Sequence, residues 1–378
     1  MYLRDRISKR MREFAAAALL RKLQPPHGID LCSNDYLGLS RHPEVKRRMA
    51  DAVMSEGCGS TGSRLLRGER SGFAAIEKRF ARFKGTEAAL YFSSGYAANI
   101  AVLATFLEPD DTVFSDELNH ASLIDGIRLG RARKVIFPHS DVSMLARKLE
   151  NESCAGQRFI AAESVFSMDG DVAPLKGYAR LAMSTGAVLI IDEAHAVGIF
   201  GERGSGCIEA QNIGSTALLS INPMGKAFGC AGAFVCGPAW AIDYLAQRAR
   251  PFVFSTAPPP AIAAAIEAAL DLVERNFEER KRVLSLARFL RQLLAERGFK
   301  VELQGSQIIP VVIGGNCEAT SVAGSLQNAG FDVRAIRPPT VPEGTARLRL
   351  SVNASLTESI LGRFADTLYT AVRSVAAA

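Results

Sequence analysis

The sequence of 378 residues predicts an α/β protein, with a mostly parallel seven-stranded sheet between helices and a smaller C-terminal α+β domain. Two observations predict this class. Between about residues 88 and 236, short apolar runs alternate with segments of helical length, as they do where helices connect parallel strands. After Pro258 a long helical segment, about residues 261–297, leads into a mixture of short strands and helices.

Seven apolar runs are expected to form the large sheet: Ala88–Phe92, Thr112–Phe114, Lys134–Phe137, Arg158–Ala162, Ala187–Ile191, Ala217–Ile221 and Gly232–Cys236. The helices expected between them are Ala97–Phe106, Ala121–Gly130, Val142–Leu149 and Pro174–Thr185. The last two runs follow each other too closely for a crossover helix, so we expect antiparallel pairing at one edge of the sheet. In the C-terminal part we expect strands at Lys300–Leu303, Ile308–Ile313 and Arg347–Val352, a helix near Ala319–Ala329 and a final helix.

The chain is longer than a single hydrophobic core usually serves, so we expect more than one domain. Residues 1–40 are expected to hold an amphipathic helix, about Leu3 to Leu23, and a segment that packs on the active site. Residues 41–257 would form the large domain. Residues 258–378 would form the long linking helix and the small C-terminal domain.

Composition excludes several classes of protein. The net charge is +6, but lysine and arginine are spread along the chain, so a nucleic-acid partner is not expected, whereas an anionic metabolite or acidic carrier is. No apolar run is long enough to span a bilayer, and the N-terminus lacks a secretory signal. The seven cysteines contain no C-x-x-C pair, which argues against a zinc site or disulfide framework. We therefore expect a cytoplasmic protein without a membrane partner.

An acidic motif at a strand end and a downstream lysine point to a cofactor. The run Ala187–Ile191 ends in Asp192-Glu-Ala-His195, and Lys226 follows in a glycine-rich loop. Pyridoxal 5′-phosphate (PLP) needs such a carboxylate to keep its ring nitrogen protonated and such a lysine to bind its aldehyde as a Schiff base. Asp-Glu-Ala-His also occurs as the acidic box of helicases, but the phosphate loop of a helicase is missing. An Asp that merely forms a turn stays an open alternative at this point.

Polar residues follow three other expected strands. They are Ser93-Ser-Gly-Tyr96, which opens a helix and could bind an anion, Asn119-His120, and the segment Glu163–Gly170. Because the carboxyl ends of parallel strands meet at one edge of a sheet, we expect these groups to converge there with Asp192. Gly57-Cys-Gly-Ser-Thr-Gly62 matches a dinucleotide-binding motif, but a helical pattern precedes it, so we expect a loop near the site instead.

Six motifs occur in one order: Asn34-Asp-Tyr-Leu-Gly38, Gly59-Ser-Thr-Gly-Ser-Arg64, Ser94-Gly-Tyr-Ala-Ala-Asn99, Leu118-Asn-His-Ala-Ser122, Glu163-Ser-Val-Phe-Ser-Met-Asp-Gly170 and Asp192-Glu-Ala-His195. In this order they resemble the α-oxoamine synthases, a family of PLP enzymes of the aminotransferase fold type I. The resemblance runs from about residue 30 to the C-terminus. Residues 336–350 most resemble the biotin-pathway branch of that family.

The resemblance implies roles around the cofactor. Lys226 would form the Schiff base and then move the Cα proton, Asp192 would pair with the ring nitrogen, His195 would bond the phenolic oxygen and His120 would stack on the ring. Gly95 and Tyr96 would bind the phosphate through their backbone amides. Ser255 and Thr256 would reach it from the neighbouring subunit, which implies a homodimer with shared sites.

The resemblance also implies a substrate side. Asn34, Ser167 and Thr340 would line it, and Glu163 would lie near the reacting centre. Arg349 would hold the carboxylate of the amino acid, because a guanidinium offers it two parallel donors. Arg21 would meet the distal carboxylate of the acyl chain, or its carrier.

Three positions depart from the family pattern. Pro223 stands three residues before Lys226, where a threonine usually binds the phosphate, and proline has neither a hydroxyl nor an N–H. We expect Ser220 or Asn222 to substitute, or else weaker binding of the phosphate. The segment from Gln24 to Asp30 is too short for the usual hairpin, and Phe73 stands where the family usually has histidine.

The implied reaction is a decarboxylative condensation of L-alanine with pimeloyl-CoA or pimeloyl-acyl carrier protein, which would release CO₂ and a free thiol. A sister synthase that uses glycine or serine with another acyl-CoA is the nearest alternative. A fold type I aminotransferase or lyase, a helicase-like ATPase and a binding protein without catalysis are the others.

Overall fold

The computed structural model describes residues 2–377. It divides into two compact units, which are described separately. One unit comprises residues 37–167 and 172–281, and the other comprises residues 1–36, 168–171 and 282–378.

The larger unit is built on a seven-stranded sheet with the order β2-β8-β7-β6-β5-β3-β4. Its strands are β2 (Ala88–Phe92), β3 (Thr112–Asp116), β4 (Arg133–Phe137), β5 (Arg158–Glu163), β6 (Val188–Asp192), β7 (Ala217–Pro223) and β8 (Ala233–Gly237). β8 pairs antiparallel with both of its neighbours, and every other pairing is parallel. The predicted sheet and its antiparallel pairing are confirmed, although β8 lies second from the edge.

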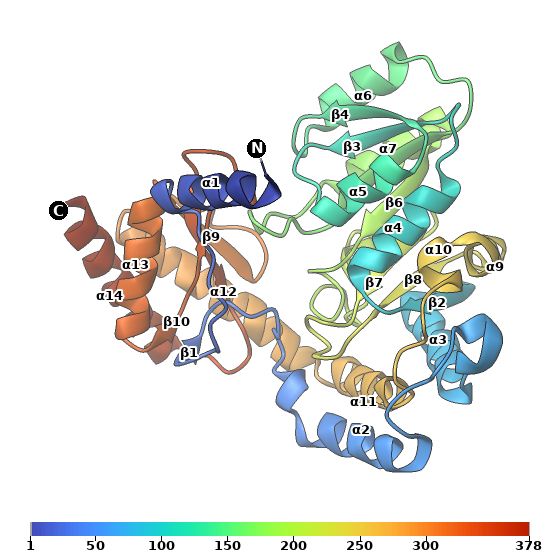
Figure 1. Cartoon of the computed structure of the whole chain (residues 1–378), viewed down its shortest axis with the longest axis horizontal. Coiled ribbons are helices and arrows are strands. Elements are labelled where there is room, and N and C mark those ends of the chain that lie inside the picture. Colours follow the sequence, from blue (N-terminus) through green and yellow to red (C-terminus); the bar gives the residue numbers. More distant parts are fainter. Residues whose placement is uncertain (1, 378) are drawn as a thin grey trace. The chain divides into compact units, whose positions relative to one another are not determined.

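Helices cover both faces of this sheet (Figure 1). On one face, Tyr91 and Phe234 pack with residues of α3 and α11 in one buried cluster. On the other face, Leu90 and Phe92 pack with residues of α4 and α5, because successive side chains of a strand point to opposite sides. The helices of this unit are η1 (Leu39–Arg41), α2 (Pro43–Glu56), the π-helical turn η2 (Arg64–Gly68), α3 (Ser71–Lys84), α4 (Gly95–Phe106), α5 (Ala121–Leu129), α6 (Val142–Asn151), α7 (Leu175–Thr185), α8 (Cys207–Ala210), α9 (Ala239–Arg248), α10 (Arg250–Val253) and α11 (Ala261–Arg275).

The smaller unit has two short sheets. In one, β1 (Ile29–Asp30) pairs parallel with β10 (Phe331–Asp332). In the other, β12 (Ala346–Ser351) lies between β11 (Ala335–Ile336) and β9 (Ile308–Gly314), antiparallel to both. The helices α13 (Asn316–Asn328) and α14 (Glu358–Ala376) pack on these strands around a separate buried cluster, to which the second half of α12 (Phe277–Glu296) contributes.

Three sequence expectations are wrong. The expected helix at residues 261–297 is two helices, because Asn276 adopts a non-helical conformation (φ −100°, ψ 53°) and ends α11. Lys300–Leu303 forms no strand. The N-terminal helix α1 (Leu3–Ala16) ends well before Leu23. Ala18, two residues after the end of the helix, adopts a left-handed conformation with φ 53°.

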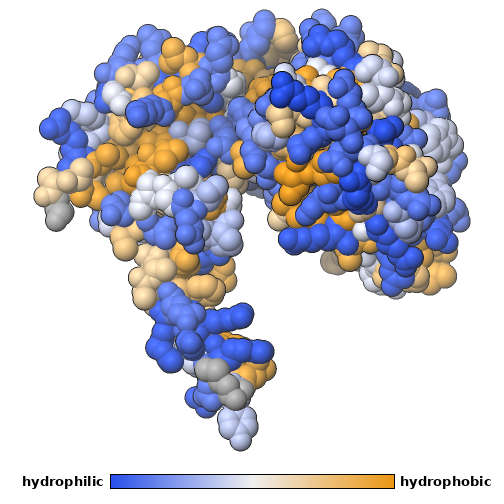
Figure 2. Space-filling model, turned by 90° about the horizontal axis from the view of Figure 1, so that it is seen from above, coloured by the Kyte–Doolittle hydropathy of each residue, from blue (hydrophilic) through white to orange (hydrophobic). Residues whose placement is uncertain are grey.

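α1 has no buried residue. Leu3, Ile7, Met11 and Phe14 follow a helical spacing and are all about half exposed or more. In Figure 2 this helix lies at the lower edge of the picture, and hydrophilic residues cover much of its visible face. Within the described residues, no helix has the length and apolar character needed to cross a membrane.

Candidate active site

The carboxyl ends of β5 and β6 bring two predicted site residues side by side. Glu163 and Asp192 are neighbours in the parallel register of these strands. Asp192 is buried, and two donors hold its carboxylate: the backbone N–H of Ala194 reaches Oδ1 at 2.8 Å, and Asn99 Nδ2 reaches Oδ2 at 2.7 Å. These two hydrogen bonds offset part of the cost of burying the charge.

His120 caps the N-terminus of α5. Its Nδ1 accepts a hydrogen bond from the backbone N–H of Ser122 at 3.2 Å, and Ser122 Oγ lies 2.7 Å from the same nitrogen. Because Nδ1 accepts, the proton of the neutral ring is on Nε2. Burial lowers the pKa of His120, and the positive charge of Lys226 lowers it further, whereas Asp192 opposes the shift. The ring is therefore neutral near pH 7.

Glu163 is the second buried carboxyl of the site. Burial raises its pKa well above the usual range, the negative charge of Asp192 raises it further, and Lys226 opposes both. The Oε1 atom accepts no hydrogen bond from the described residues. The raised pKa favours the neutral form of Glu163 beside Asp192.

Lys226 lies in the turn between β7 and β8. Backbone bonds from Met224 N to Gly232 O and from Gly229 N to Lys226 O fix this turn. Gly229 has φ 61°, and a Cβ there would lie 2.1 Å from Ser40 N, so only glycine fits. The Lys226 charge acts on both Glu163 and His120, which places the lysine among the predicted site residues.

The N-terminus of α4 forms an anion cradle next to β7. Ser94 Oγ accepts from Ala97 N at 3.1 Å, which leaves the N–H groups of Gly95 and Tyr96 without a bond to any residue that the structure describes. Gly95 must be glycine, because a Cβ there would lie 2.6 Å from Cγ of Pro223. Pro223 thus forms one wall of the cradle but adds no donor.

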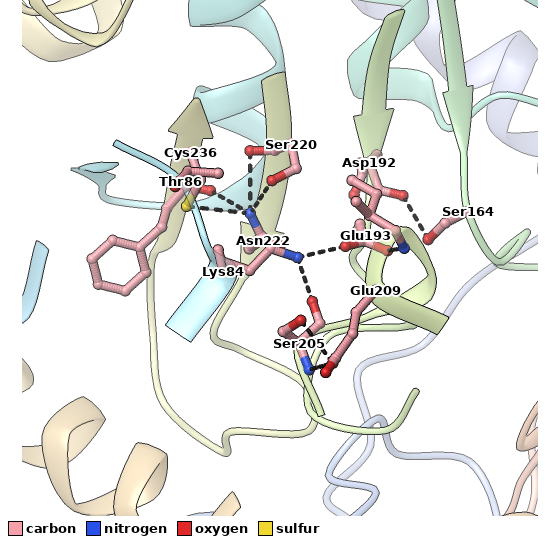
Figure 3. A network of polar contacts seen from close by, with 12 residues as sticks. Lys84, Thr86, Ser164, Asp192, Glu193, Ser205, Glu209, Ser220, Asn222 and Cys236 are labelled. Carbon is pink, nitrogen blue, oxygen red and sulfur yellow. Dashed lines mark hydrogen bonds and ion pairs between the residues drawn. The ribbon is translucent and has the colours of Figure 1, made fainter. Parts of the chain in front are cut away.

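Of the two alternatives for the missing threonine, substitution by Ser220 or Asn222 is not supported by the direction of these side chains. Asn222 Nδ2 donates to Ser220 Oγ at 3.0 Å and also lies near Cys236 Sγ, as Figure 3 shows. Residues 220 and 222 share one face of β7 and Pro223 belongs to the other, because side chains alternate along a strand. Both polar side chains are therefore directed away from Gly95.

A buried ion pair supports the segment that follows Asp192. Lys84 Nζ lies 2.5 Å from Oε2 of Glu193, and both side chains are almost fully buried. Lys84 also donates to the carbonyl of Ser205 (Figure 3). Ile208 N donates to Glu193 Oε1 at 3.0 Å. The pair thus joins the end of α3 to the loop between β6 and α8.

Other predicted residues of the larger unit lie as follows. His195 and Ser167 are buried. Ser255 and Thr256 border a small cavity of about 20 Å³, which Ser93 also lines. Phe73, the third departure from the family, is a core residue that stacks on Tyr91 with ring centroids 5.9 Å apart.

In the smaller unit, the structure brings two predicted substrate residues together. Arg349 is buried on β12 and donates to Asn34 Oδ1 at 3.0 Å. It also donates to Ser351 Oγ at 2.9 Å and to Tyr36 Oη at 3.4 Å. The neighbouring Arg347 pairs instead with Asp169 at 2.5 Å, so the charge of Arg347 is compensated by a carboxylate.

Arg21 and Thr340 also meet in this unit. Arg21 Nη2 lies 3.5 Å from Thr340 Oγ1 and 3.5 Å from the carbonyl of Pro338, and these contacts are exposed. No hairpin precedes Asn34 in the described chain, where β1 has two residues only. The structure thus agrees with the short segment noted in the sequence.

No role was predicted from the sequence for Asn99, Ser122 and Tyr36, although all three belong to the sequence motifs. Each is a direct hydrogen-bond partner of a predicted site residue: Asn99 of Asp192, Ser122 of His120 and Tyr36 of Arg349. A polar residue at a predicted buried helical position, such as Asn99, is the signal that could have identified the first of them.

The arrangement suits PLP. Two N–H groups at the start of α4 would bind its phosphate, Asp192 its ring nitrogen and Lys226 its aldehyde. The cradle lacks a hydroxyl at position 223, but no group that the chemistry requires is missing.

The raised pKa of Glu163 predicts a pH-dependent effect of Glu163→Gln. Below the unfolded pKa near 4.5, wild type and variant both hold a neutral side chain. As the pH rises through the raised folded pKa, wild type loses stability and the glutamine does not. In urea unfolding of cofactor-free protein we expect the variant to gain on the order of 1 kcal/mol relative to wild type between pH 5 and pH 8. Glu278→Gln, at an exposed position, is the control, and a difference that stays constant with pH would contradict the assignment.

The chain resembles known proteins over almost its whole length. The profile of "Aminotransferase class I and II" matches residues 26–368. An 8-amino-7-oxononanoate synthase of Geobacter sulfurreducens is 46% identical over 335 residues, which cover 88% of this chain and 86% of the relative. The corresponding protein of Bordetella petrii is 42% identical over 387 residues, covering 97% and 98%.

Solved structures agree with this result. Serine palmitoyltransferase from S. paucimobilis, bound to a PLP–myriocin aldimine, has a TM-score of 0.91 at 28% identity and covers 99% of this chain and 98% of its own. A crystal structure of 8-amino-7-oxononanoate synthase from Francisella tularensis has a TM-score of 0.80 at 29% identity, covering 92% and 98%. The chain therefore belongs to the aminotransferase class I and II family and has its PLP-dependent fold type I.

Proposed function

We propose that this protein is a PLP-dependent acyltransferase that condenses L-alanine with a pimeloyl thioester, giving 8-amino-7-oxononanoate, CO₂ and a free thiol. The observation that carries the proposal is the group formed by Asp192, His120, Glu163 and Lys226 in the larger unit, in a chain 42–46% identical to proteins named for this activity. The reaction would belong to biotin biosynthesis.

Bound PLP would supply an electron sink that stabilises negative charge at Cα of the amino acid. Asp192, held as a carboxylate acceptor by Ala194 and Asn99, would keep a proton on the ring nitrogen. His120 would lie against the ring, and Lys226 Nζ would take the Cα proton and later return one. The neutral Glu163 can donate a hydrogen bond to an oxygen that gains negative charge during the acyl transfer.

Substrate carboxylates would be bound by the arginines of the smaller unit. Arg349 is proposed to hold the carboxylate of L-alanine until it leaves as CO₂, since the charge of Arg347 already faces Asp169. Asn34 orients Arg349 through the bond to its Nη2. Arg21 and Thr340, in contact with each other at an exposed position, would meet the distal carboxylate of the pimeloyl chain.

A serine-using synthase is the second candidate. It is favoured by the TM-scores of 0.91 to serine palmitoyltransferase structures, which exceed the 0.80 to the oxononanoate synthase. Sequence identity favours alanine, because the relatives at 42–46% identity carry the oxononanoate synthase name, whereas the palmitoyltransferase structures are 28–30% identical.

Substrate identity is tested with the PLP-loaded enzyme and a panel of amino acids and acyl thioesters. We expect thiol release with L-alanine and pimeloyl-CoA or pimeloyl-acyl carrier protein, at a kcat/KM at least tenfold above that with glycine or L-serine. Lys226→Ala should lose turnover by several orders of magnitude because it removes the base. Equal turnover with glycine or serine, or full turnover by Lys226→Ala, would refute the proposal.

Retention of the cofactor is tested at Pro223. In Pro223→Thr, a hydroxyl would face Gly95 and add one donor to the phosphate cradle. We expect the dissociation constant for PLP, measured by fluorescence during dialysis against free cofactor, to fall about tenfold, corresponding to roughly 1.4 kcal/mol. Pro223→Val, which fills the space without a donor, is the control. Equal dissociation constants for the threonine and valine variants would show that the hydroxyl adds nothing.

We also propose that the protein is a cytoplasmic homodimer with shared active sites. Phe254, which directly precedes Ser255 and Thr256, is 72% exposed, and Leu66 in η2 is 84% exposed. Large exposed apolar side chains are typical of a surface that a partner covers. All seven cysteines are free thiols, which agrees with a reducing compartment.

A mixing experiment tests the shared site. Lys226→Ala and the double variant Ser255→Ala/Thr256→Ala carry their defects in different parts of the proposed site. If the two parts come from different subunits, half of the randomly mixed dimers are hybrids with one intact site. We then expect about a quarter of wild-type activity to return on mixing. No recovery, or a mass of 40.6 kDa in light scattering, would contradict the dimer.

A further inference from the structure

Asn99 makes two hydrogen bonds that connect separate parts of the proposed site. It lies in α4 and is 2% exposed. Its Nδ2 group donates to Asp192 Oδ2 at 2.7 Å and to Ser122 Oγ at 2.8 Å, and Ser122 Oγ lies 2.7 Å from His120 Nδ1. A continuous chain of hydrogen bonds thus runs from Asp192 to His120.

The orientation of the Asn99 amide is determined by its partners. With the amide turned over, Oδ1 would face the Asp192 carboxylate, and two acceptors would repel each other. In the observed orientation Oδ1 is buried and accepts no hydrogen bond within the described part of the chain. An orphaned buried acceptor costs about 1–3 kcal/mol, so the two donor bonds must compensate for it.

The same bonds set the hydroxyl of Ser122. Because Ser122 Oγ accepts from Asn99, its own hydrogen is directed to His120 Nδ1, which already accepts from Ser122 N. Both contacts favour the ring with its proton on Nε2. Close packing of two helices holds the hydrogen-bond chain from Asp192 to His120 in place: α5 lies so close to α4 that a Cβ on Gly126 would lie 3.0 Å from Asn99 O.

We infer that Asn99 is a positioning residue: through one amide group it fixes the Asp192 carboxylate for the ring nitrogen and the tautomer of His120 for the ring face. It acts through these two side chains, to which its amide is bonded directly (Asp192) or through Ser122 (His120). The inference rests on the proposed PLP function for its purpose, but the hydrogen-bond chain itself is a property of the cofactor-free protein. Asn99 Nδ2 donates to one oxygen of the Asp192 carboxylate and Ala194 N donates to the other.

The first experiment uses cofactor-free protein, so that it does not depend on PLP. The ring nitrogens of His120 are followed by ¹⁵N NMR against pH and assigned with His120→Gln. We expect an unprotonated Nδ1 in wild type. Asn99→Leu removes the donor that makes Ser122 Oγ an acceptor, so the Ser122 hydroxyl is no longer held toward Nδ1 and the tautomer ratio of the neutral His120 ring should shift toward Nδ1–H. An unchanged tautomer ratio in Asn99→Leu would overturn the coupling.

The second experiment measures PLP binding by fluorescence. Asn99→Leu removes both donors at nearly constant volume and should raise the dissociation constant for PLP about tenfold or more, because Asp192 loses its side-chain donor. Asn222→Leu is the matched control: Asn222 is also buried with an orphaned Oδ1, and its amide serves Ser220 on the other face of the sheet. A tenfold rise in Asn99→Leu alone supports the inference, and equal changes in both variants would overturn it.

Ser122→Ala tests the hydrogen bonds toward His120 separately from the bond between Asn99 and Asp192. It is also the test variant if Asn99→Leu does not fold. It removes the hydroxyl between Asn99 and His120 but leaves the bond from Asn99 to Asp192. We expect the His120 titration and tautomer to change while the dissociation constant for PLP stays within about twofold of wild type. An unchanged His120 tautomer would overturn this branch. If wild type itself binds no PLP, the proposed function fails, whereas the NMR result still decides whether Asn99 sets the tautomer of His120.

Discussion

The burial of a carboxylate at the end of a parallel strand is the constraint on which the site depends. Ala194 N and Asn99 Nδ2 donate to Asp192 there and offset part of the cost of burying its charge. Burial raises the pKa of the neighbouring Glu163 and the Asp192 charge raises it further, whereas the same charge opposes the lowering of the His120 pKa by burial. The raised pKa of Glu163 favours a side chain that can donate a hydrogen bond, whereas Asp192 accepts two.

The two faces of the sheet carry different groups of polar residues. On the face of α4 and α5, the helix N-termini, Pro223 and the chain from Asp192 to His120 form the proposed cofactor site. On the opposite face, Asn222 and Cys236 lie near the buried pair of Lys84 and Glu193 (Figure 3). Breaking such a buried pair typically costs about 3–5 kcal/mol, so the pair stabilises the segment that follows Asp192.

Much of the larger unit could be predicted from the sequence, because its strands are continuous apolar runs and its helices fall between them. The strand ends at Glu163 and Asp192 followed directly from this alternation. The expectations that were wrong depended on a few residues. Asn276 interrupts a helical pattern that otherwise continues through α11 and α12. Residues 300–303 alternate like a strand but pair with no other strand. The roles of Asn99 and Ser122 could not be predicted, since a hydrogen bond between α4 and β6 requires their relative placement, which no local pattern encodes.

The most direct test of the account is an experimental structure of the protein reconstituted with PLP, with electron density clear enough to place the ring. The account predicts a covalent link to Lys226 Nζ and the ring nitrogen within hydrogen-bond distance of Asp192. It also predicts that the phosphate lies at the N–H groups of Gly95 and Tyr96 and that Asn99 keeps both of its bonds. A ring bound elsewhere, or an Asp192 carboxylate turned away from the ring nitrogen, would contradict it.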